Sequence, residues 1–220
     1  MPDSSSLSTA ETRARVRDSI GTHYSGVLHF AFTNLLGVSV MVASLSRLHA
    51  PTALALLTVP LTFFYANLVE YFAHRNPMHR PMRPFGIIYQ RHSLEHHAFF
   101  TEAEMQAEST RDFKMVLFPW FMVIFFFGLF ALPAGLLVQL LFGSNAGALF
   151  LATAMAYFLT YEWLHLSYHL SPKLALGRIP LVQRLRRHHA RHHDPRAMSR
   201  HNFNITFPIC DALFGTSLRP

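Results

Sequence analysis

The sequence predicts an all-α integral membrane protein, with four transmembrane helices in two hairpins and a histidine-rich helical cap on the cytoplasmic side of the membrane. Three observations predict this fold. Long apolar runs come in two pairs, and histidine-rich stretches follow the second and fourth runs. The short loops that join the two runs of each pair contain no lysine or arginine. Only 14% of the 220 residues are charged, whereas ordinary soluble domains carry about 25%.

The N-terminal residues 1–26 are polar and are expected to form a loosely held cytoplasmic tail. Ser8 and Glu11 have the spacing of a capping box, which predicts a short helix that carries three arginines. No apolar stretch of the signal-peptide type follows this basic start. The remaining residues, 27–220, form the predicted membrane domain.

Four apolar runs are each long enough to cross about 30 Å of hydrocarbon as helices. Their expected bounds are 27–48, 52–73, 115–142 and 146–166. Because only three residues separate the members of each pair, each pair is predicted to form an antiparallel hairpin. Pro119 and Pro133 leave two interpretations of the third run: one tilted, kinked helix, or a shorter span with a re-entrant segment.

The distribution of lysine and arginine predicts the orientation of the spans. Of the nineteen such residues, three lie in 1–26, one borders the first hairpin loop, and the other fifteen lie in 75–114 and 173–219. Both termini and the cap (74–112 and 167–220) are therefore expected in the cytoplasm. The membrane is then a bacterial inner membrane or, in a eukaryote, the endoplasmic reticulum. Since the positive charge flanks apolar runs, nucleic acid is not an expected partner.

Eleven of the fifteen histidines lie in the two stretches 74–97 and 165–193. Residues three or four apart on a helix share a face, so such a pair can point two imidazoles at one place. The pairs with this spacing are His92/His96, His165/His169 and His189/His192.

His74 and His79 are five residues apart and would diverge on an unbroken α-helix. Pro77 lies between them and biases Asn76 away from helical dihedral angles. A helix end at this point is therefore expected to turn His79 back toward the other histidines.

Imidazole nitrogens suit zinc, iron, copper and nickel, whereas magnesium and calcium prefer oxygen ligands. Ten nitrogens exceed what one tetrahedral zinc takes, and they would supply about five to each of two ions. The single cysteine, Cys210, excludes a thiolate cage. The predicted ligands are His74, His79, His92, His96, His97, His165, His169, His189, His192 and His193.

A basic patch at 184–193 that touches anionic lipid headgroups is the alternative interpretation of the second stretch. It accounts for the arginines there but not for the histidines at 74–97. His188 and His201 are borderline members of the site. The three histidines expected to lie outside it are His23, His29 and His49.

Four carboxylates are expected to support the ligands: Glu70, Glu162, Asp194 and Asp211. Histidines that bind a metal usually donate their other N–H to a carboxylate or a carbonyl. For each of the four, a helix cap or an arginine partner is an equally open interpretation. No catalytic residue is predicted beyond the metal ligands themselves.

The histidine motifs in this order, followed by NFNITFPICDALFGT at 202–216, resemble the fatty acid hydroxylase / sterol desaturase superfamily of integral membrane oxygenases. The resemblance extends over 70–216 and includes the Asp-x-x-Phe-Gly-Thr pattern that begins at Asp211. The chain departs from the family pattern twice. Three residues, and not the commoner two, separate His92 from the double histidine, and Asn204 stands where the family often has glycine.

The resemblance implies a four-helix membrane fold with a cytoplasmic, histidine-lined dimetal centre that uses dioxygen to attack an unactivated C–H bond of a lipid. Iron is implied as the working metal, and zinc can occupy the site in purified protein because it binds nitrogen ligands more tightly than ferrous iron. An apolar substrate could reach the site from the bilayer past Phe125–Phe127, but plain lipid-facing or helix-packing surface is the preferred interpretation of this aromatic run. Electrons are expected from a separate donor protein, since no haem-binding segment is appended.

Three other functions use the same residues. A lipid desaturase, or an enzyme that cleaves a fatty aldehyde or an ether lipid, would need the same ligands. A metal transporter or sensor is the non-enzymatic alternative. A transporter would place polar residues at the centres of the spans, whereas these histidines lie where the spans end.

Overall fold

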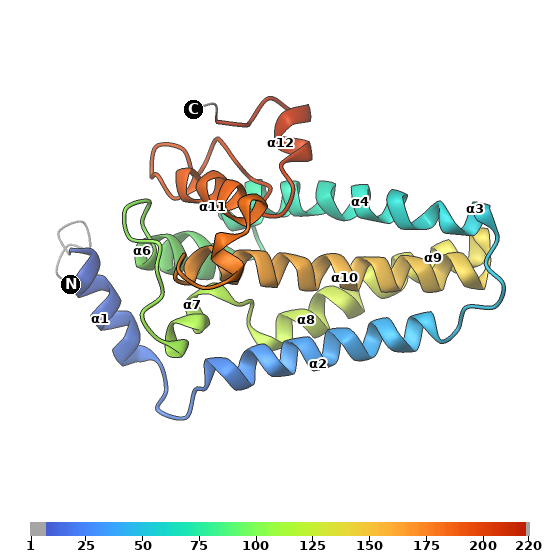
Figure 1. The fold of residues 1–220 in the computed structure, drawn as a ribbon, viewed down its shortest axis with the longest axis horizontal. Coiled ribbons are helices and arrows are strands. Elements are labelled where there is room, and N and C mark those ends of the chain that lie inside the picture. The colour runs from blue at the N-terminus through green and yellow to red at the C-terminus, as the bar shows by residue number, and fades with distance from the viewer. Residues whose placement is uncertain (1–7, 219–220) are drawn as a thin grey trace. The chain divides into compact units, whose positions relative to one another are not determined.

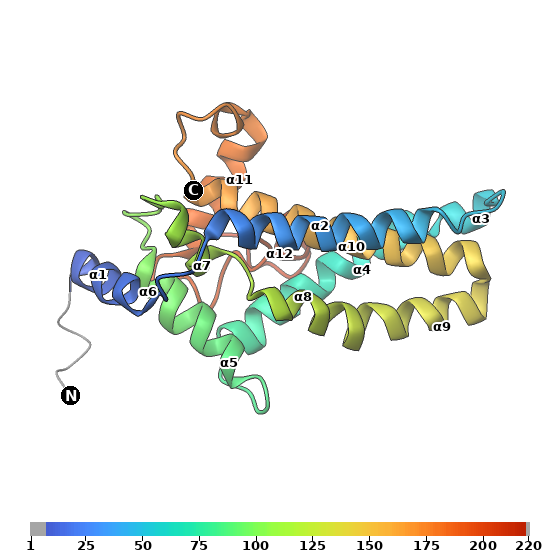
Figure 2. The same ribbon diagram turned by 90° about the horizontal axis from the view of Figure 1, so that it is seen from below.

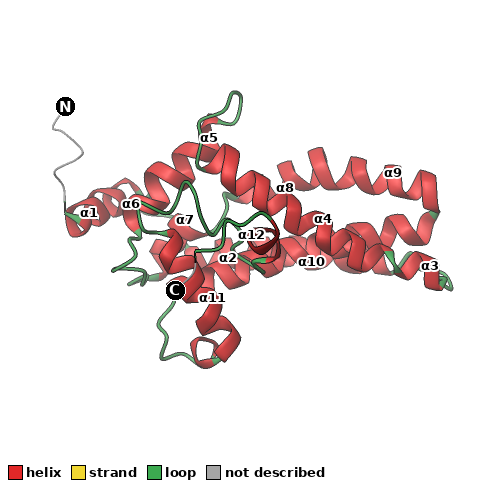
Figure 3. Ribbon diagram, turned by 90° about the horizontal axis from the view of Figure 1, so that it is seen from above, coloured by secondary structure: helices red, strands yellow, loops and turns green. Residues whose placement is uncertain are grey.

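The computed structural model describes residues 8–218, and these residues form helices, turns and loops without a β-strand (Figure 3). They divide into two compact units. The histidine unit comprises the described parts of Met1–Gly26 and Leu164–Pro220, together with Glu70–Leu117. The apolar unit comprises Val27–Val69 and Phe118–Trp163. The predicted all-α class is confirmed.

Three helical stretches are long and apolar enough to cross a membrane: Gly26–Leu45, Ala53–Met78 and Thr110–Phe142. The fourth predicted span corresponds to α10 (Ser144–His169), which has 26 residues but is not one of these three. Its second half contains tyrosines, a glutamate and two histidines, and these lower its hydropathy. The other helices of the apolar unit are α2 (Gly26–Leu45), α3 (Ala53–Leu56), α4 (Thr58–Ala73), α8 (Trp120–Phe126) and α9 (Leu132–Phe142).

Within the apolar unit, α2, α4, α9 and α10 run alongside one another (Figure 1, Figure 2). Gly143 ends α9 with φ 91°, a conformation that glycine adopts without strain, and α10 begins at the next residue. The loop between α2 and α3 meets this turn, because His49 N–H donates to Asn145 Oδ1 (2.9 Å) and Asn145 Nδ2 donates back to the His49 carbonyl (2.8 Å). The two predicted hairpins are therefore formed, and their loops contact each other.

The third apolar run is interrupted at 117–119, next to the first of its two prolines, and it continues through the second proline. The short helix α7 (Phe113–Val116) ends at an extended Leu117, and the chain is then helical without a gap from Trp120 to Phe142. The π-helical turn η5 (Phe127–Ala131) widens this helix before Pro133, and the helix continues across it.

The backbone of the break at Phe118 is satisfied by two polar side chains of the apolar unit. His29 Nε2 lies 3.0 Å from the Phe118 carbonyl, and Phe118 N–H donates to Glu162 Oε1 at 3.4 Å. A backbone group at membrane depth finds no water, so it needs such partners. This explains the polar residues of the adjoining helices.

The histidine unit is built mostly from short helices, which in the sequence precede, separate and follow the two parts of the apolar unit. Its elements are α1 (Thr9–Ser19), the π-helix η2 (His74–Met78), α5 (Gly86–Tyr89), the π-helix η3 (Gln90–His96), α6 (His97–Phe99), η4 (Thr110–Asp112), α7, η6 (Leu176–Arg178), α11 (Pro180–His192) and α12 (Ile209–Leu213). Large aromatic residues are fully buried among them: Tyr71, Phe99, Phe100, Tyr168 and Phe203.

The N-terminal helix α1 begins with the predicted capping box, in which Ser8 and Glu11 bond reciprocally. The expectation of a loosely held segment is corrected for the described residues from 8 onward. Arg13 on α1 is only 5% exposed and donates its Nε–H to the carbonyl of Phe99, 86 residues further along the chain. Contacts this distant in sequence left no trace in the local pattern.

Candidate metal centre

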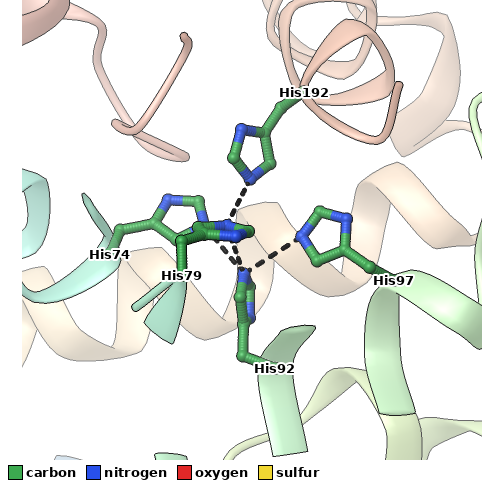
Figure 4. A group of neighbouring side chains, drawn as sticks. All are labelled: His74, His79, His92, His97 and His192. Carbon is green, nitrogen blue, oxygen red and sulfur yellow. Dashed lines mark hydrogen bonds between the residues drawn. The ribbon is translucent and has the colours of Figure 1, made fainter. Parts of the chain in front are cut away.

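All ten histidines predicted as ligands are buried, and they lie together in the histidine unit. Five form the first histidine group, in which all the rings point toward one centre (Figure 4). Its members are His74, His79, His92, His97 and His192. Within each such group, the nitrogens that face a metal lie no more than 4.8 Å from one another.

The other five form the second histidine group. His96, His165, His169 and His189 are close enough to share one ion. His193 adjoins them, since its Nε2 lies 3.0 Å from that of His189 and 3.2 Å from that of His96. His193 also belongs to a set with His96 and His97, which connects the two groups.

Two π-helical turns place histidines that are five residues apart side by side. In a π-helix the hydrogen bond runs from residue i to i+5, so these two positions lie above each other. His74 and His79 flank η2, and their Nε2 atoms are 3.1 Å apart. His92 and His97 are related in the same way by η3, at 3.2 Å. The convergence of His74 and His79 was expected, but a widened helix produces it and not a helix end at Pro77.

The structure also corrects two predicted pairs. His92 and His96 belong to different groups, and so do His189 and His192. His165 and His169 do lie in one group, as predicted.

Each double histidine is divided between the two groups. Neighbouring residues on a helix project about 100° apart. His97 therefore faces the first group and His96 the second, while His192 faces the first group and His193 the second. This explains why the sequence carries two adjacent histidines at each of these positions.

Five of the ten histidines donate the N–H of their other ring nitrogen, Nδ1, to a backbone carbonyl. Their Nδ1 atoms lie within hydrogen-bond distance of carbonyl oxygens: His74 at Phe203 (2.5 Å), His96 at Met115 (2.7 Å), His169 at Met105 (2.9 Å), His192 at His201 (2.8 Å) and His193 at Phe100 (2.6 Å). A carbonyl only accepts, so each of these Nδ1 atoms carries the proton. Their Nε2 atoms therefore carry a lone pair.

His79 is fixed in the same tautomer by Ser93. The Ser93 hydroxyl donates to the Met78 carbonyl at 2.7 Å and so accepts from His79 Nδ1 at 3.1 Å. His79 Nε2 lies 2.9 Å from His192 Nε2, whose own proton is also on Nδ1. Two nitrogen lone pairs thus face each other at a distance that repels unless a cation lies between them. The donor set and its protonation fit a transition-metal ion.

Burial keeps the histidines neutral, which is the form that binds a metal. Removal from water lowers the pKa of His79, His92 and His97 well below the ordinary value, and the neighbouring imidazoles lower it further. In the second group, burial lowers the pKa of His96 to about 4.

Glu70 supports the centre through the backbone of a neighbouring loop. Its carboxylate accepts from the N–H groups of Ile205 (2.5 Å) and Thr206 (2.9 Å) and from the Thr206 hydroxyl (2.6 Å). These bonds fix the loop whose Phe203 carbonyl orients His74.

Asp211 holds the same loop from its other side. It accepts from the N–H groups of Phe203 (2.9 Å) and Asn204 (2.8 Å). Burial alone would raise the pKa of Asp211, but hydrogen bonds from His188, Thr216 and these two N–H groups together lower it. These hydrogen bonds therefore favour the charged form of the buried Asp211 carboxylate.

The remaining candidates have other roles. Glu162 lies in the apolar unit and accepts from Phe118 N–H, and Asp194 Oδ1 accepts from Arg196 N–H at 2.9 Å in a turn. The two borderline histidines lie outside the groups: His188 pairs with Asp211 at 3.4 Å, and His201 contributes only its carbonyl to His192. Sequence reasoning missed Ser93 and Arg13, because neither has a spacing that marks it.

Asn204, which departs from the family pattern, is also part of this loop. Its side-chain Oδ1 accepts from the N–H groups of Cys210 (3.1 Å) and Asp211 (3.2 Å) at the start of α12. The asparagine therefore fixes α12 against the loop, and the departure removes no ligand.

Membrane-length apolar helices together with buried histidine groups that could hold metal ions are features of membrane-bound metalloproteins. A comparison with protein families gives the particular family: residues 59–216 match the family described as Fatty acid hydroxylase. The chain belongs to this family, within the fatty acid hydroxylase / sterol desaturase superfamily. Comparisons with curated proteins and with solved structures gave no significant match.

Replacing Glu70 by glutamine is expected to weaken metal binding about 10- to 100-fold, the usual effect of losing a partner that orients the ligands. Glutamine has the same size but turns an N–H donor toward the N–H groups of Ile205 and Thr206. Metal content after dialysis against a graded chelator series measures the effect. Exposed Glu102→Gln is the control, and equal retention in both variants would contradict the role of the loop.

Proposed function

We propose that this protein is a membrane-bound lipid hydroxylase that binds two transition-metal ions and uses dioxygen and external electrons to hydroxylate an unactivated C–H bond. One observation carries the proposal: unprotonated Nε2 atoms of neighbouring histidines face each other, such as those of His79 and His192, which are 2.9 Å apart. Membership of the fatty acid hydroxylase family supports the lipid as substrate.

The first histidine group would hold one ion and the second group the other. Iron is proposed as the working metal, since a site of imidazoles without thiolates suits it, and zinc can replace iron during purification. When bound, the metals supply the activation of dioxygen and the oxidation of the C–H bond. The protein supplies the ligand geometry.

The side chains around the ions serve to orient ligands and to exclude water. His74, His169 and His192 are fully buried. Carbonyl acceptors hold the Nδ1 protons of the ligands, so those rings cannot turn to offer Nδ1 to the metal. No acid or base beyond the ligands is assigned to the reaction.

The proposed membrane topology has four spans, with α10 as the fourth. Although α10 is less apolar than the other three, its 26 residues are long enough to cross the bilayer. Both termini and the histidine unit are placed in the cytoplasm by the distribution of lysine and arginine. The lipid substrate would come from the bilayer, and a separate protein would donate electrons.

Desaturation is the second candidate, because the family match supports lipid oxidation without fixing its product. Lipid mass spectrometry of cells with and without the gene separates the two reactions. A hydroxylase adds one oxygen to a lipid, whereas a desaturase removes two hydrogens. A lipid cleaved at an aldehyde or ether bond would contradict both candidates, and unchanged lipids with altered cellular metal content would indicate a transporter.

Purified protein is expected to hold two transition-metal ions per chain, since ten ligands divide into two groups. Elemental analysis of anaerobically prepared, undenatured protein measures the number. A stable content of one ion per chain would contradict the two-metal proposal.

A further inference from the structure

We propose that the N-terminal helix α1 is part of the metal centre: Arg13 and Arg17 hold the segment 99–112 in the shape that orients two ligands of the second histidine group. This inference rests on the proposed function, because it assigns positioning residues to the same centre. All the residues that carry it lie in the histidine unit.

Arg13 bonds to three separate points of the segment. Its Nε–H donates to the Phe99 carbonyl at 2.8 Å, one terminal N–H donates to the Glu104 carbonyl at 2.5 Å, and the other to Glu108 Oε1 at 3.0 Å. The planar guanidinium presents its donors at fixed angles. Three acceptors that are up to nine residues apart are thereby brought to one point.

Arg17, one helical turn later, fixes the far end of the segment. It donates to both oxygens of the fully buried Asp112, at 2.9 and 2.8 Å, and pairs with Glu108 at 2.8 Å. Hydrogen bonds from Arg17 and Arg13 lower the pKa of Glu108. Asp112 in turn accepts from the N–H groups of Glu108 and Ser109.

The segment held in this way supplies two of the carbonyls that orient ligands. Phe100 accepts from His193 Nδ1 at 2.6 Å, and Met105 accepts from His169 Nδ1 at 2.9 Å. Ala107 N–H also donates to the His169 carbonyl at 2.7 Å. Both histidines belong to the second group, and no orienting carbonyl of the first group comes from this segment.

Ring contacts extend the connection from α1 to the ligands. The guanidinium carbons of Arg13 and Arg17 lie 5.2 and 5.3 Å from the centre of the Phe99 ring. The next ring along the chain, Phe100, lies 4.1 Å from the ring of His169. A substitution at Arg13 is therefore expected to disturb the orientation of His169 and His193 more than that of His74 or His92.

The exit of α1 is fixed as well. Arg111 donates to the carbonyl of Ile20, the residue that caps α1, at 3.0 Å. Gly26 lies so close to the segment that a Cβ there would be 1.8 Å from the Thr110 carbonyl oxygen. The chain that leaves α1 is thus in contact with the end of the segment at Thr110 and Arg111.

The test is the number and affinity of bound ions in Arg13→Ala, compared with wild type and with Arg15→Ala. Arg15 lies on the same helix but is exposed, so its replacement is expected to keep both ions. Arg13→Ala is expected to keep one ion and to bind the second about 10- to 100-fold more weakly, as for other partners that orient ligands. Two ions at wild-type affinity, or loss of both ions together, would overturn the inference.

Chemical rescue separates positioning from general stability. Guanidinium ion at millimolar concentration is expected to restore the second ion to Arg13→Ala, because it offers planar donors to the same three acceptors, whereas ammonium is not. Where the alanine variant does not accumulate, Arg13→Lys serves the same test. Lysine keeps the charge but cannot reach all three acceptors, so retention of both ions at wild-type affinity in Arg13→Lys overturns the inference. Wild-type protein that binds no metal would instead overturn the proposed function.

Discussion

His192→Ala is expected to remove one metal ion and to abolish lipid oxidation, while the second ion stays bound. His192 is fully buried and belongs to the first histidine group alone. Alanine takes away a ligand and leaves His79 Nε2 without its nearest partner, at 2.9 Å. His96→Ala is expected to show the converse, with loss of the ion in the second group and the same loss of activity.

Elemental analysis and product formation by lipid mass spectrometry measure these outcomes. His23→Ala and His49→Ala are the controls, because both histidines are exposed and lie outside the groups. Full metal content and turnover in His96→Ala would show that the assignment of ligands is wrong. Loss of both ions in either variant would show that the two groups bind as one unit.

Acidification from about pH 7 to 5 is expected to release the metals and to loosen the histidine unit. Histidine ordinarily titrates near pH 6.5, whereas burial lowers the pKa of His96 to about 4 and also lowers the pKa of His193 well below the ordinary value. The folded-state pKa is therefore below the unfolded one. Stability is complete above about pH 6.5 and is lost as the pH falls toward the lowered values, because only the unfolded chain then takes up protons.

The expected pH dependence is steep, because many buried histidines add to it. Each one lowers the free energy of unfolding by up to about 1.4 kcal/mol per pH unit in this range. Metal content and proteolysis of segments 74–112 and 170–220 at each pH measure the effect. The apolar helices are expected to stay protected. Equal metal retention and protease resistance at both ends of the range would indicate ligands other than histidine.

The candidate ligands could be predicted from the sequence because metal-binding histidines must recur at short spacings on helices. All ten reached the groups, and the pair His165/His169 follows the ordinary α-helical rule. The pairings of His92 with His96 and of His189 with His192 failed: the first pair lies in a π-helix and the second in an α-helix, and in both pairs the two rings belong to different groups. The change from α-helical to π-helical dihedral angles in η3 leaves no signature in the residue types.

The supporting contacts could not be predicted, because they depend on backbone atoms far away in the chain. Every non-proline residue offers the same carbonyl and N–H, so the amino-acid sequence does not mark the carbonyl of Phe100 or Phe203 as an acceptor. The carboxylates of Glu70 and Asp211 were expected to accept from ligating histidines, whereas their partners in the structure include N–H groups of the loop. The hairpins, in contrast, follow from apolar length and turn residues alone.

The π-helix η3 shows how a motif of one histidine followed by a double histidine can tolerate an inserted residue. In α11 the motif has two residues between His189 and the double histidine, and the helix there is an ordinary α-helix. The first such motif has three residues between His92 and the double histidine, one more than is common in the family. A π-helical turn accommodates an added residue without changing the helix on either side. His97 thus meets His92 at 3.2 Å, much as His193 meets His189 at 3.0 Å. A search pattern with a fixed spacing would miss this chain, although its helix absorbs the extra residue where it occurs.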